Sequence, residues 1–443
     1  MDVSRRTFLA TAGALTAGTL VPGRLLAAVQ KHTPAAPNLS NWAAVKSLFP
    51  LARDKAQFAG FFIASHPKPV SDAIQAFRRA IDESPYLQVD QRMFASETDN
   101  VLAQVCRSAA PYMAAKPDEI ALTQNTTTGL ALVYHGLPLA PGDEILVTEH
   151  DHFSHHEAVR TAAQRAGATT RRVSLYEDAS KVTTDDVVAR IEKAIRPETR
   201  VLGVTWVHSS SGVRLPIRAI AFLVGQVNAQ RDPKKQLLLV VDGVHGFGCI
   251  DESAAELGAD FFSAGTHKWM FAPRGTGVLW GRADRWPLIR PTIPSFASLA
   301  LYEAWLKGEP PGATTAAMVS PGGFQAYEHQ WAMGAAFEMH AKLGRARVAS
   351  RIRALNDQLK QGLAAMKQVH VHTPMEADVS AGIVAFEVAG LKPEQVVAKL
   401  LERNIIASTS PYRVTYARLS AGLINDEQEV DAALRAVRGL AGA

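Results

Sequence analysis

The chain has 443 residues, of which 47% are hydrophobic and 20% are charged, and its formal net charge at pH 7 is +5. This composition is typical of a globular protein, and the length is sufficient for two domains that share one active site. So small a net charge gives no support to a nucleic-acid or membrane-surface partner.

Residues 1–28 are predicted to be a removable export signal. They contain a twin-arginine pattern, Ser4-Arg5-Arg6-Thr7-Phe8-Leu9, and a mildly apolar run that ends at small residues, Ala27 and Ala28. The run is too short and too rich in Gly and Thr to act as a stable membrane anchor. We therefore expect export of the folded protein to the periplasm by the twin-arginine (Tat) machinery.

Residues 29–80 are predicted to form an N-terminal segment that runs over the surface. Residues 60–70 read as a short strand and a Pro-rich turn, and helical patterns follow at residues 70–83 and 97–115. The second pattern carries Cys106, and the only other cysteine is Cys249. Neither position is typical of a structural disulfide in a protein with so large a core, so we expect the two cysteines to be unpaired.

A strand at residues 119–124 leads into a polar turn and an apolar helix. The turn reads Gln124-Asn125-Thr126-Thr127-Thr128-Gly129. Free backbone N–H groups, hydroxyls and the positive end of the helix dipole favour an anion there. The threonines can alternatively serve only as helix caps.

The next strand ends in a group of histidines: His150, His152, His155 and His156. Their spacing is close to the H-x-H-x-D-H pattern of dinuclear metal hydrolases, although Ser154 stands where that pattern has Asp. A metal-dependent hydrolase is therefore an alternative from a different class.

Residues 184–195 read as a helix capped by Thr184, and a strand at residues 200–207 leads to a loop with Ser209. This alternation of strands and helices predicts an α/β fold with a mostly parallel sheet flanked by helices.

Two further strands bring an acid and an amine to one edge of that sheet. The apolar run at residues 236–242 ends in Asp242, and residues 260–265 lead to Thr266, His267 and Lys268. Parallel strands present their carboxyl ends at the same edge, where ligands bind. Pyridoxal 5'-phosphate (PLP) chemistry requires such a pair. A lysine binds the aldehyde of the cofactor as a Schiff base, and a carboxylate lies at the nitrogen of its ring.

The order D-G-x-H, then T-H-K about twenty-five residues later, then P-x-G-x-G resembles the class V aminotransferase family of fold-type I PLP enzymes. The resemblance implies a large PLP-binding domain at residues 81–325 and a smaller C-terminal α+β domain at residues 326–443. It makes Lys268 the catalytic lysine. The cofactor-binding residues that it implies are Asp242 at the ring nitrogen, His245 and Ser209 near the ring hydroxyl, Thr126 and Thr127 at the phosphate, His152 stacked on the ring (or His150 in another register), and His267.

The same resemblance implies how substrate binds. Arg418, in the segment Ala417-Arg418-Leu419-Ser420, matches the arginine that holds a substrate α-carboxylate. Ser65 and His66 lie where the family's N-terminal segment crosses the substrate site. Residues 290–323, which are rich in Pro, Gly, Ser and Thr, match a loop that reaches the phosphate of a neighbouring subunit, so a homodimer is implied.

The sequence constrains the reaction less than the cofactor. Residues 380–417 contain no cysteine, which excludes a cysteine desulfurase that uses a nucleophilic Cys on this loop. The segments PGGF and EHQWA resemble the isopenicillin N epimerase-like group, whose exported members include periplasmic enzymes that tailor the amino-acid side group of a pyoverdine-type siderophore. We predict transamination or related deaminating chemistry at the α-carbon of an amino acid, free or attached to a peptide. Epimerisation is the close alternative, and a catalytically silent binding protein is another.

Overall fold

A computed structural model describes residues 38–95 and 100–440. The predicted export signal at residues 1–28, and the start of the helix predicted from residue 97, lie outside these ranges. Within the described ranges, no helix combines the length and the apolar character needed to cross a bilayer.

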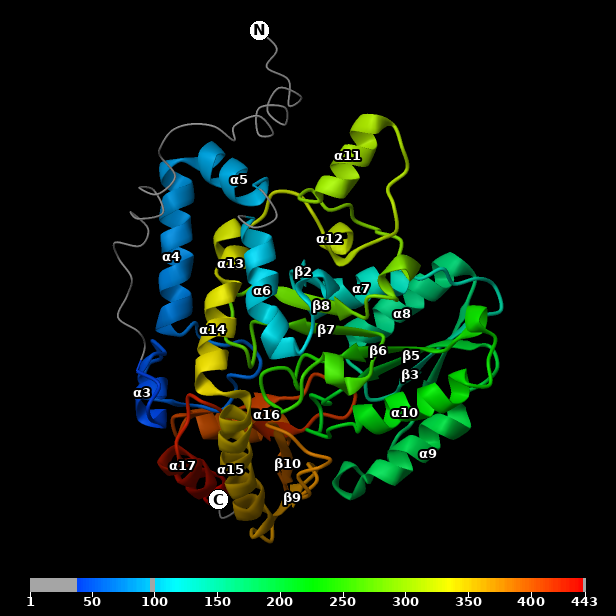
Figure 1. Ribbon diagram of the computed structural model, residues 1–443. Coiled ribbons are helices and arrows are strands. Elements are labelled where there is room, and N and C mark those ends of the chain that lie inside the picture. Colours follow the sequence, from blue (N-terminus) through cyan, green and yellow to red (C-terminus); the bar gives the residue numbers. More distant parts are fainter. Residues whose placement is uncertain (1–37, 96–99, 441–443) are drawn as a thin grey trace. The chain divides into compact units, whose positions relative to one another are not determined.

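The seven-stranded sheet has the order β2-β8-β7-β6-β5-β3-β4 (Figure 1). The five strands from β7 to β4 are parallel to one another, whereas β8 is antiparallel to both of its neighbours. This confirms the predicted α/β fold with a mostly parallel sheet, and the continuous apolar runs follow from burial of the strands on both faces. The bounds are β2 (Ile120–Thr123), β3 (Glu144–Thr148), β4 (Thr169–Val173), β5 (Thr199–Thr205), β6 (Leu238–Asp242), β7 (Phe261–Gly265) and β8 (Gly277–Gly281).

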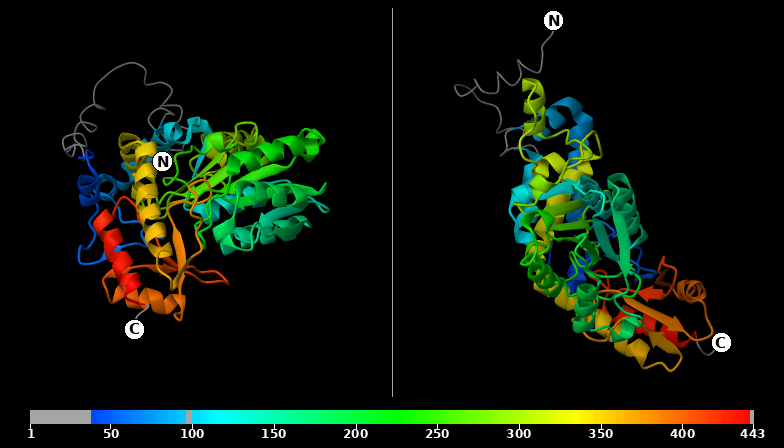
Figure 2. Two further views of the ribbon diagram at one scale, coloured as in Figure 1. Left: turned by 90° about the horizontal axis from the view of Figure 1, so that it is seen from below. Right: turned by 90° about the vertical axis from the view of Figure 1, so that its right-hand side faces the viewer.

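Helices cover both faces of this sheet (Figure 2). One apolar core joins α7 (Thr126–Gly136) and α8 (Phe153–Ala166) to one face. A second core joins α6 (Val101–Met113), α9 (Thr184–Ala194) and α10 (Ile217–Asn228) to the other. The cap of α9 is Thr183, whose side chain accepts from Asp186 N, and not the predicted Thr184.

The second sheet is antiparallel and has the order β12-β13-β10-β9. The apolar face of this sheet packs against three helices, and together they enclose a separate apolar core. The predicted boundary between residues 325 and 326 stays a prediction. The bounds are β9 (Val369–Val371), β10 (Val384–Val388), β12 (Ser408–Thr409), β13 (Ala417–Leu419), α15 (Arg345–Ala364), α16 (Pro393–Leu401) and α17 (Glu427–Arg438).

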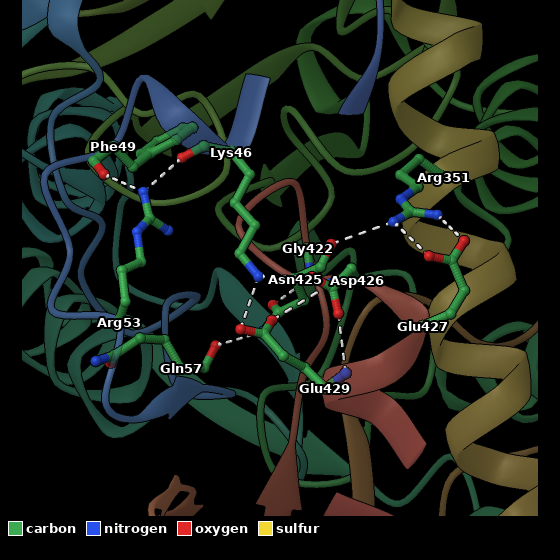
Figure 3. A network of polar contacts seen from close by, with 10 residues as sticks. All are labelled: Lys46, Phe49, Arg53, Gln57, Arg351, Gly422, Asn425, Asp426, Glu427 and Glu429. Atoms are coloured by element: carbon green, nitrogen blue, oxygen red, sulfur yellow. Dashed lines mark hydrogen bonds and ion pairs between the residues drawn. The ribbon is translucent and has the colours of Figure 1, made fainter. Parts of the chain in front are cut away.

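The N-terminal part of the described chain is tied to its C-terminal part. Strand β1 (Ala56–Gln57) pairs in parallel with β11 (Ile405–Ile406). Ion pairs join α3 (Trp42–Ser47) to the start of α17, because Lys46 Nζ lies 2.8 Å from Asp426 and 2.7 Å from Glu429 (Figure 3). The prediction of a strand within residues 60–70 is wrong, since Phe62 N donates to Ala59 O in a turn and the pairing strand comes earlier.

Helices also occur where the sequence has little periodicity. Residues 290–323 contain α11 (Leu299–Lys307) and α12 (Ala316–Val319), and α11 buries none of its residues. Because none of its side chains is buried, no amphipathic pattern marks α11 in the sequence. The remaining α-helices of the described ranges are α4 (Lys68–Glu83), α5 (Pro85–Met93), α13 (Tyr327–Trp331) and α14 (Met333–Leu343).

Candidate active site

The ends of β6 and β7 bring the predicted acid and amine together. Asp242 closes β6 and pairs in register with Ser263 of β7, and Lys268 follows in the loop after β7. Lys268 Nζ lies 3.1 Å from His245 Nε2. The carboxylate of Asp242 is close enough to raise the pKa of this lysine. The three residues therefore form one cluster at the carboxyl edge of the parallel sheet.

Burial governs the protonation of this cluster. It lowers the pKa of Lys268 to about 8, against an opposing effect of Asp242 and with a further lowering by the charge of Arg418. Burial raises the pKa of Asp242, while His155, the hydrogen bond from Val244 N and Lys268 act in the opposite direction. Burial also lowers the pKa of His245 well below its usual range, so this imidazole is neutral. Lys268 thus becomes a free amine much nearer to neutral pH than an exposed lysine.

The polar turn before α7 lies against the loop that carries Lys268. Thr126 Oγ1 accepts from Gly265 N at 2.8 Å. The cap of α7 is Asn125, whose Oδ1 accepts from Thr128 N at 2.9 Å, so capping does not occupy the hydroxyls of Thr126 and Thr127. The first-turn N–H groups of a helix have no partner within the helix and attract an anion. The turn is therefore in place to hold a phosphate beside the lysine.

The histidines after β3 have four separate protein partners. His150 stacks on Tyr176 with ring centroids 3.8 Å apart, and His155 Nε2 lies 2.6 Å from Tyr134 Oη. His156 is bonded to Thr148 O, and His152 Nδ1 lies 2.8 Å from Ser154 Oγ. Across residues 38–95 and 100–440, no group of three or more His, Cys, Asp or Glu side chains is placed so that it could hold a metal ion. Within these ranges, the metal-hydrolase alternative therefore lacks a donor set.

Of the two stacking candidates, His152 is the one beside the cluster. The charges of Lys268 and Arg418 both act on His152, whose pKa burial lowers to about 4. His150 instead packs against Tyr176 and His208. His267, between the cluster and the P-x-G-x-G loop, has its Nδ1 3.4 Å from Thr276 O.

Arg418 on β13 is a buried cation, only 3% exposed. Its guanidinium donates to Ser209 O at 2.5 Å and to Thr409 O at 2.7 Å, while its Nε has no partner. Burial lowers the pKa of Arg418 to about 10. Within the residues that the structure describes, no acidic side chain lies within ion-pair distance of it. A negatively charged ligand would supply the missing counter-charge.

Phe61 belongs to the site, although the sequence did not single it out. The Arg418 guanidinium lies 4.9 Å from the Phe61 ring centroid, and the Phe61 and His245 rings are 5.8 Å apart. The neighbouring Ala64 N donates to His267 O, which holds this segment over the lysine loop. Nothing distinguishes Phe61 from the other apolar residues of its segment in the sequence.

Ser65 and His66, which were predicted to touch substrate, follow Phe61 in this segment. His66 Nε2 accepts from Arg274 N at 3.2 Å, and its ring lies edge-on to His329. Their contact with substrate stays a prediction.

Tyr412 is a second residue that the sequence did not identify. It lies in the turn between β12 and β13, and its Oη is 2.7 Å from Ser209 Oγ. Its ring is edge-on to that of His152, with centroids 6.1 Å apart. Its position in the loop just before Arg418 is the only signal that sequence reasoning could have used.

The residues present fit PLP. The buried carboxylate of Asp242 suits a protonated ring nitrogen, and the amine of Lys268 suits the aldehyde. The buried Nδ1 of His245 has no protein partner, which leaves a polar atom for the ligand. The start of α7 supplies the anion site. When bound, the cofactor would act as an electron sink for a bond broken at the substrate α-carbon.

Comparison with known proteins agrees with this fit. Isopenicillin N epimerase of Streptomyces clavuligerus is 26% identical over 388 residues, which cover 85% of this chain and 92% of the relative. A probable cysteine desulfurase of Halalkalibacterium halodurans is 26% identical over 336 residues, 72% of this chain and 77% of the relative. A solved complex of the cystine C–S lyase C-DES with cysteine persulfide has a TM-score of 0.76 at 25% identity, covering 88% and 99% of the two chains. The profile of the aminotransferase class-V family matches residues 64–433, so the chain belongs to this family of PLP-dependent enzymes.

Proposed function

We propose that this PLP-dependent enzyme acts at the α-carbon of an amino acid, free or attached to a peptide, whose α-carboxylate binds Arg418. The observation that carries the proposal is the buried guanidinium of Arg418, which has no acidic partner among the described residues. Its Nε is free to donate, and a carboxylate is the anion that best matches a guanidinium.

In this proposal Lys268 is the general base. Its lowered pKa provides a free amine that can take the α-proton, and His245, 3.1 Å away, orients it. Asp242 holds the ring nitrogen, and Thr126 and Thr127 at the start of α7 hold the phosphate. Ser209 and His152 flank the ring, with His267 beside Lys268.

The named relatives support epimerisation more directly than transamination. Isopenicillin N epimerases of Streptomyces clavuligerus and Amycolatopsis lactamdurans are 26% and 27% identical to this chain. Transamination or related deamination, which the sequence favoured, starts with the same proton removal and is the second candidate. This chain has no cysteine that could serve as a desulfurase nucleophile beside Arg418. Its two cysteines, Cys106 and Cys249, are free and buried, and both are distant in sequence from this loop.

We further propose that the enzyme is exported, that it works as a homodimer, and that its substrate is a modified peptide such as a siderophore precursor. The twin-arginine pattern supports export. Exposed aromatic side chains in the 290–325 region, Trp305 at 73% and Phe324 at 77%, support a subunit contact there.

A spectral screen of the holoenzyme tests this function. Amino acids and peptides with a free α-amino and α-carboxylate group should change the visible absorbance of the bound cofactor. Arg418→Gln should raise the KM for such substrates about tenfold to a hundredfold, because a charged hydrogen-bond donor is lost. Arg413→Gln is the matched control, because Arg413 is exposed in the turn just before β13. A holoenzyme whose spectrum no such compound changes would indicate a silent binding protein instead.

A further inference from the structure

We propose that Tyr412 is a second acid–base residue of this site, which exchanges a proton between its phenol and the substrate α-carbon, so that the enzyme inverts the configuration of that carbon. This inference rests on the proposed function, in which Lys268 removes the α-proton. It deepens that function by assigning the reaction to epimerisation.

The turn between β12 and β13 fixes the position of the phenol. Ser410 N donates to Tyr416 O and Tyr416 N donates to Ser410 Oγ, both at 2.9 Å, so the base of the turn is closed. At its tip, Tyr412 Oη lies 2.7 Å from Ser209 Oγ. The carbonyl of the same Ser209 accepts from Arg418. The phenol is therefore placed next to the group that would hold the α-carboxylate, and the α-carbon is bonded directly to that carboxylate.

Tyr412 and Lys268 enter the site from different sheets. Lys268 follows β7 of the large sheet and has His245 as its partner. Tyr412 comes from the small antiparallel sheet, has Ser209 as its partner and lies edge-on to His152. Inversion by a two-base route requires two proton carriers that act independently. Among the described residues, these two side chains share no hydrogen-bond partner.

The other groups near the site are less suited to this role. The side chain of His152 caps α8, with its Nδ1 accepting from Ser154 N, and burial lowers its pKa to about 4. His245 Nε2 is engaged by Lys268. Burial raises the pKa of Tyr412 to about 12, against the effects of its Ser209 bond and of Arg418, so its hydroxyl keeps a proton to give at neutral pH.

The proton balance closes without a co-reactant. Lys268 Nζ takes the α-proton and leaves its bonding electron pair at the α-carbon. The electron pair at the α-carbon then takes the phenol proton of Tyr412 and forms the new C–H bond on the opposite side. The electrons of the broken O–H bond stay on the phenol oxygen. Ser209 Oγ can pass a proton from solvent back to Tyr412, and Lys268 releases its proton to solvent. The reverse reaction exchanges the two roles.

The test compares Tyr412→Phe with the wild-type holoenzyme in heavy water. The substrates are both enantiomers of each protein amino acid, and isopenicillin N, which the relatives' name identifies as their substrate. The wild type should exchange the α-hydrogen of both enantiomers and invert them. Tyr412→Phe should still exchange one enantiomer through Lys268, while inversion and exchange of the other fall at least about a hundredfold. Tyr416→Phe, in the same turn with its ring stacked on His372, is the matched control and should behave as the wild type.

A binding measurement separates this role from a structural one. The amino acid 2-methylalanine has no α-hydrogen, and its binding is read from the visible absorbance of the cofactor. Its Kd should be unchanged in Tyr412→Phe. A loss of 2-methylalanine binding equal to the loss of inversion would overturn the proposal in favour of simple positioning of Ser209 and Arg418.

Three other outcomes would also overturn the proposal. Inversion by Tyr412→Phe at the wild-type rate would remove Tyr412 from the chemistry. Exchange by the wild type without inversion would contradict the inference and leave the proposed function standing. If the wild type exchanges no α-hydrogen from any of these compounds, both proposals fall together.

Discussion

At the scale of single residues, Lys268 should capture the cofactor at an unusually low pH. Burial lowers its pKa to about 8, so the reactive free amine accumulates as the pH rises through about 8 rather than through the value of about 10.4 for an exposed lysine. The rate of PLP uptake by the apoprotein, followed by visible absorbance, should rise with a midpoint near pH 8. A midpoint near 10 would contradict the burial of this amine.

The control for this experiment is Lys268→Ala. After borohydride treatment, mass spectrometry should find the cofactor fixed to the wild-type peptide that contains Lys268 and absent from the variant. Covalent labelling of the variant at another lysine would show that a different amine holds the aldehyde.

The residues that sequence reasoning identified share one physical property. Asp242 ends a strand of the large sheet, and Lys268 and Thr126 follow two other strands of that sheet by three residues each. The carboxyl ends of parallel strands meet by geometry alone. Phe61 and Tyr412 come from turns, and their positions depend on how distant parts of the chain pack. No periodicity records such packing, so the sequence could not place these two side chains.

At the scale of secondary-structure elements, β5 requires a glycine at position 203. A Cβ there would lie 2.2 Å from Tyr134 Oη and 2.9 Å from His155 Nε2, the two atoms that are hydrogen-bonded at 2.6 Å. His155 is completely buried, and its charge acts on the pKa of Asp242. The glycine thus leaves room for a buried polar pair behind the cofactor site.

Gly203→Ala should therefore lower the free energy of unfolding by about 1–3 kcal/mol, because the added methyl group overpacks a full core. Gly225→Ala is the matched control, since Gly225 is exposed on α10 and an added Cβ there would meet no atom within 4 Å. This control should gain about 0.4–1 kcal/mol. Urea unfolding of both variants measures the difference, and equal effects would show that Tyr134 and His155 can move aside.

Element prediction succeeded where a helix or strand buries a face. The buried parallel strands β3, β5, β6 and β7 and the helix α9 have regular apolar patterns because they pack on the core. The polar and largely exposed β4 was not predicted. In α11 no residue is buried, and its ends are set by a Ser298 cap and a left-handed Gly308. These local signals occur in many turns, so they do not separate a short exposed helix from a loop.

At the scale of the whole molecule, the cofactor should stabilise the fold through its phosphate. At a hundredfold excess over Kd, PLP should add about 2.7 kcal/mol to the free energy of unfolding. Pyridoxal lacks the phosphate, so it leaves the N-terminus of α7 without an anion and binds with a higher Kd. At the same concentration it should therefore stabilise the protein less. Thermal unfolding with each compound measures this, and equal stabilisation would argue against a phosphate site at Thr126 and Thr127.

The pairing of β1 with β11 has a consequence for the order in which the protein is made. Ala56 aligns with Ile405, so the two strands of this small sheet leave the ribosome with the whole large sheet made between them. Phe61, a few residues after β1, reaches Arg418 only once β13 has formed. Such long-range closure is slow in folding. The nascent chain therefore cannot assemble a working catalytic centre until the residues of β13 have been made.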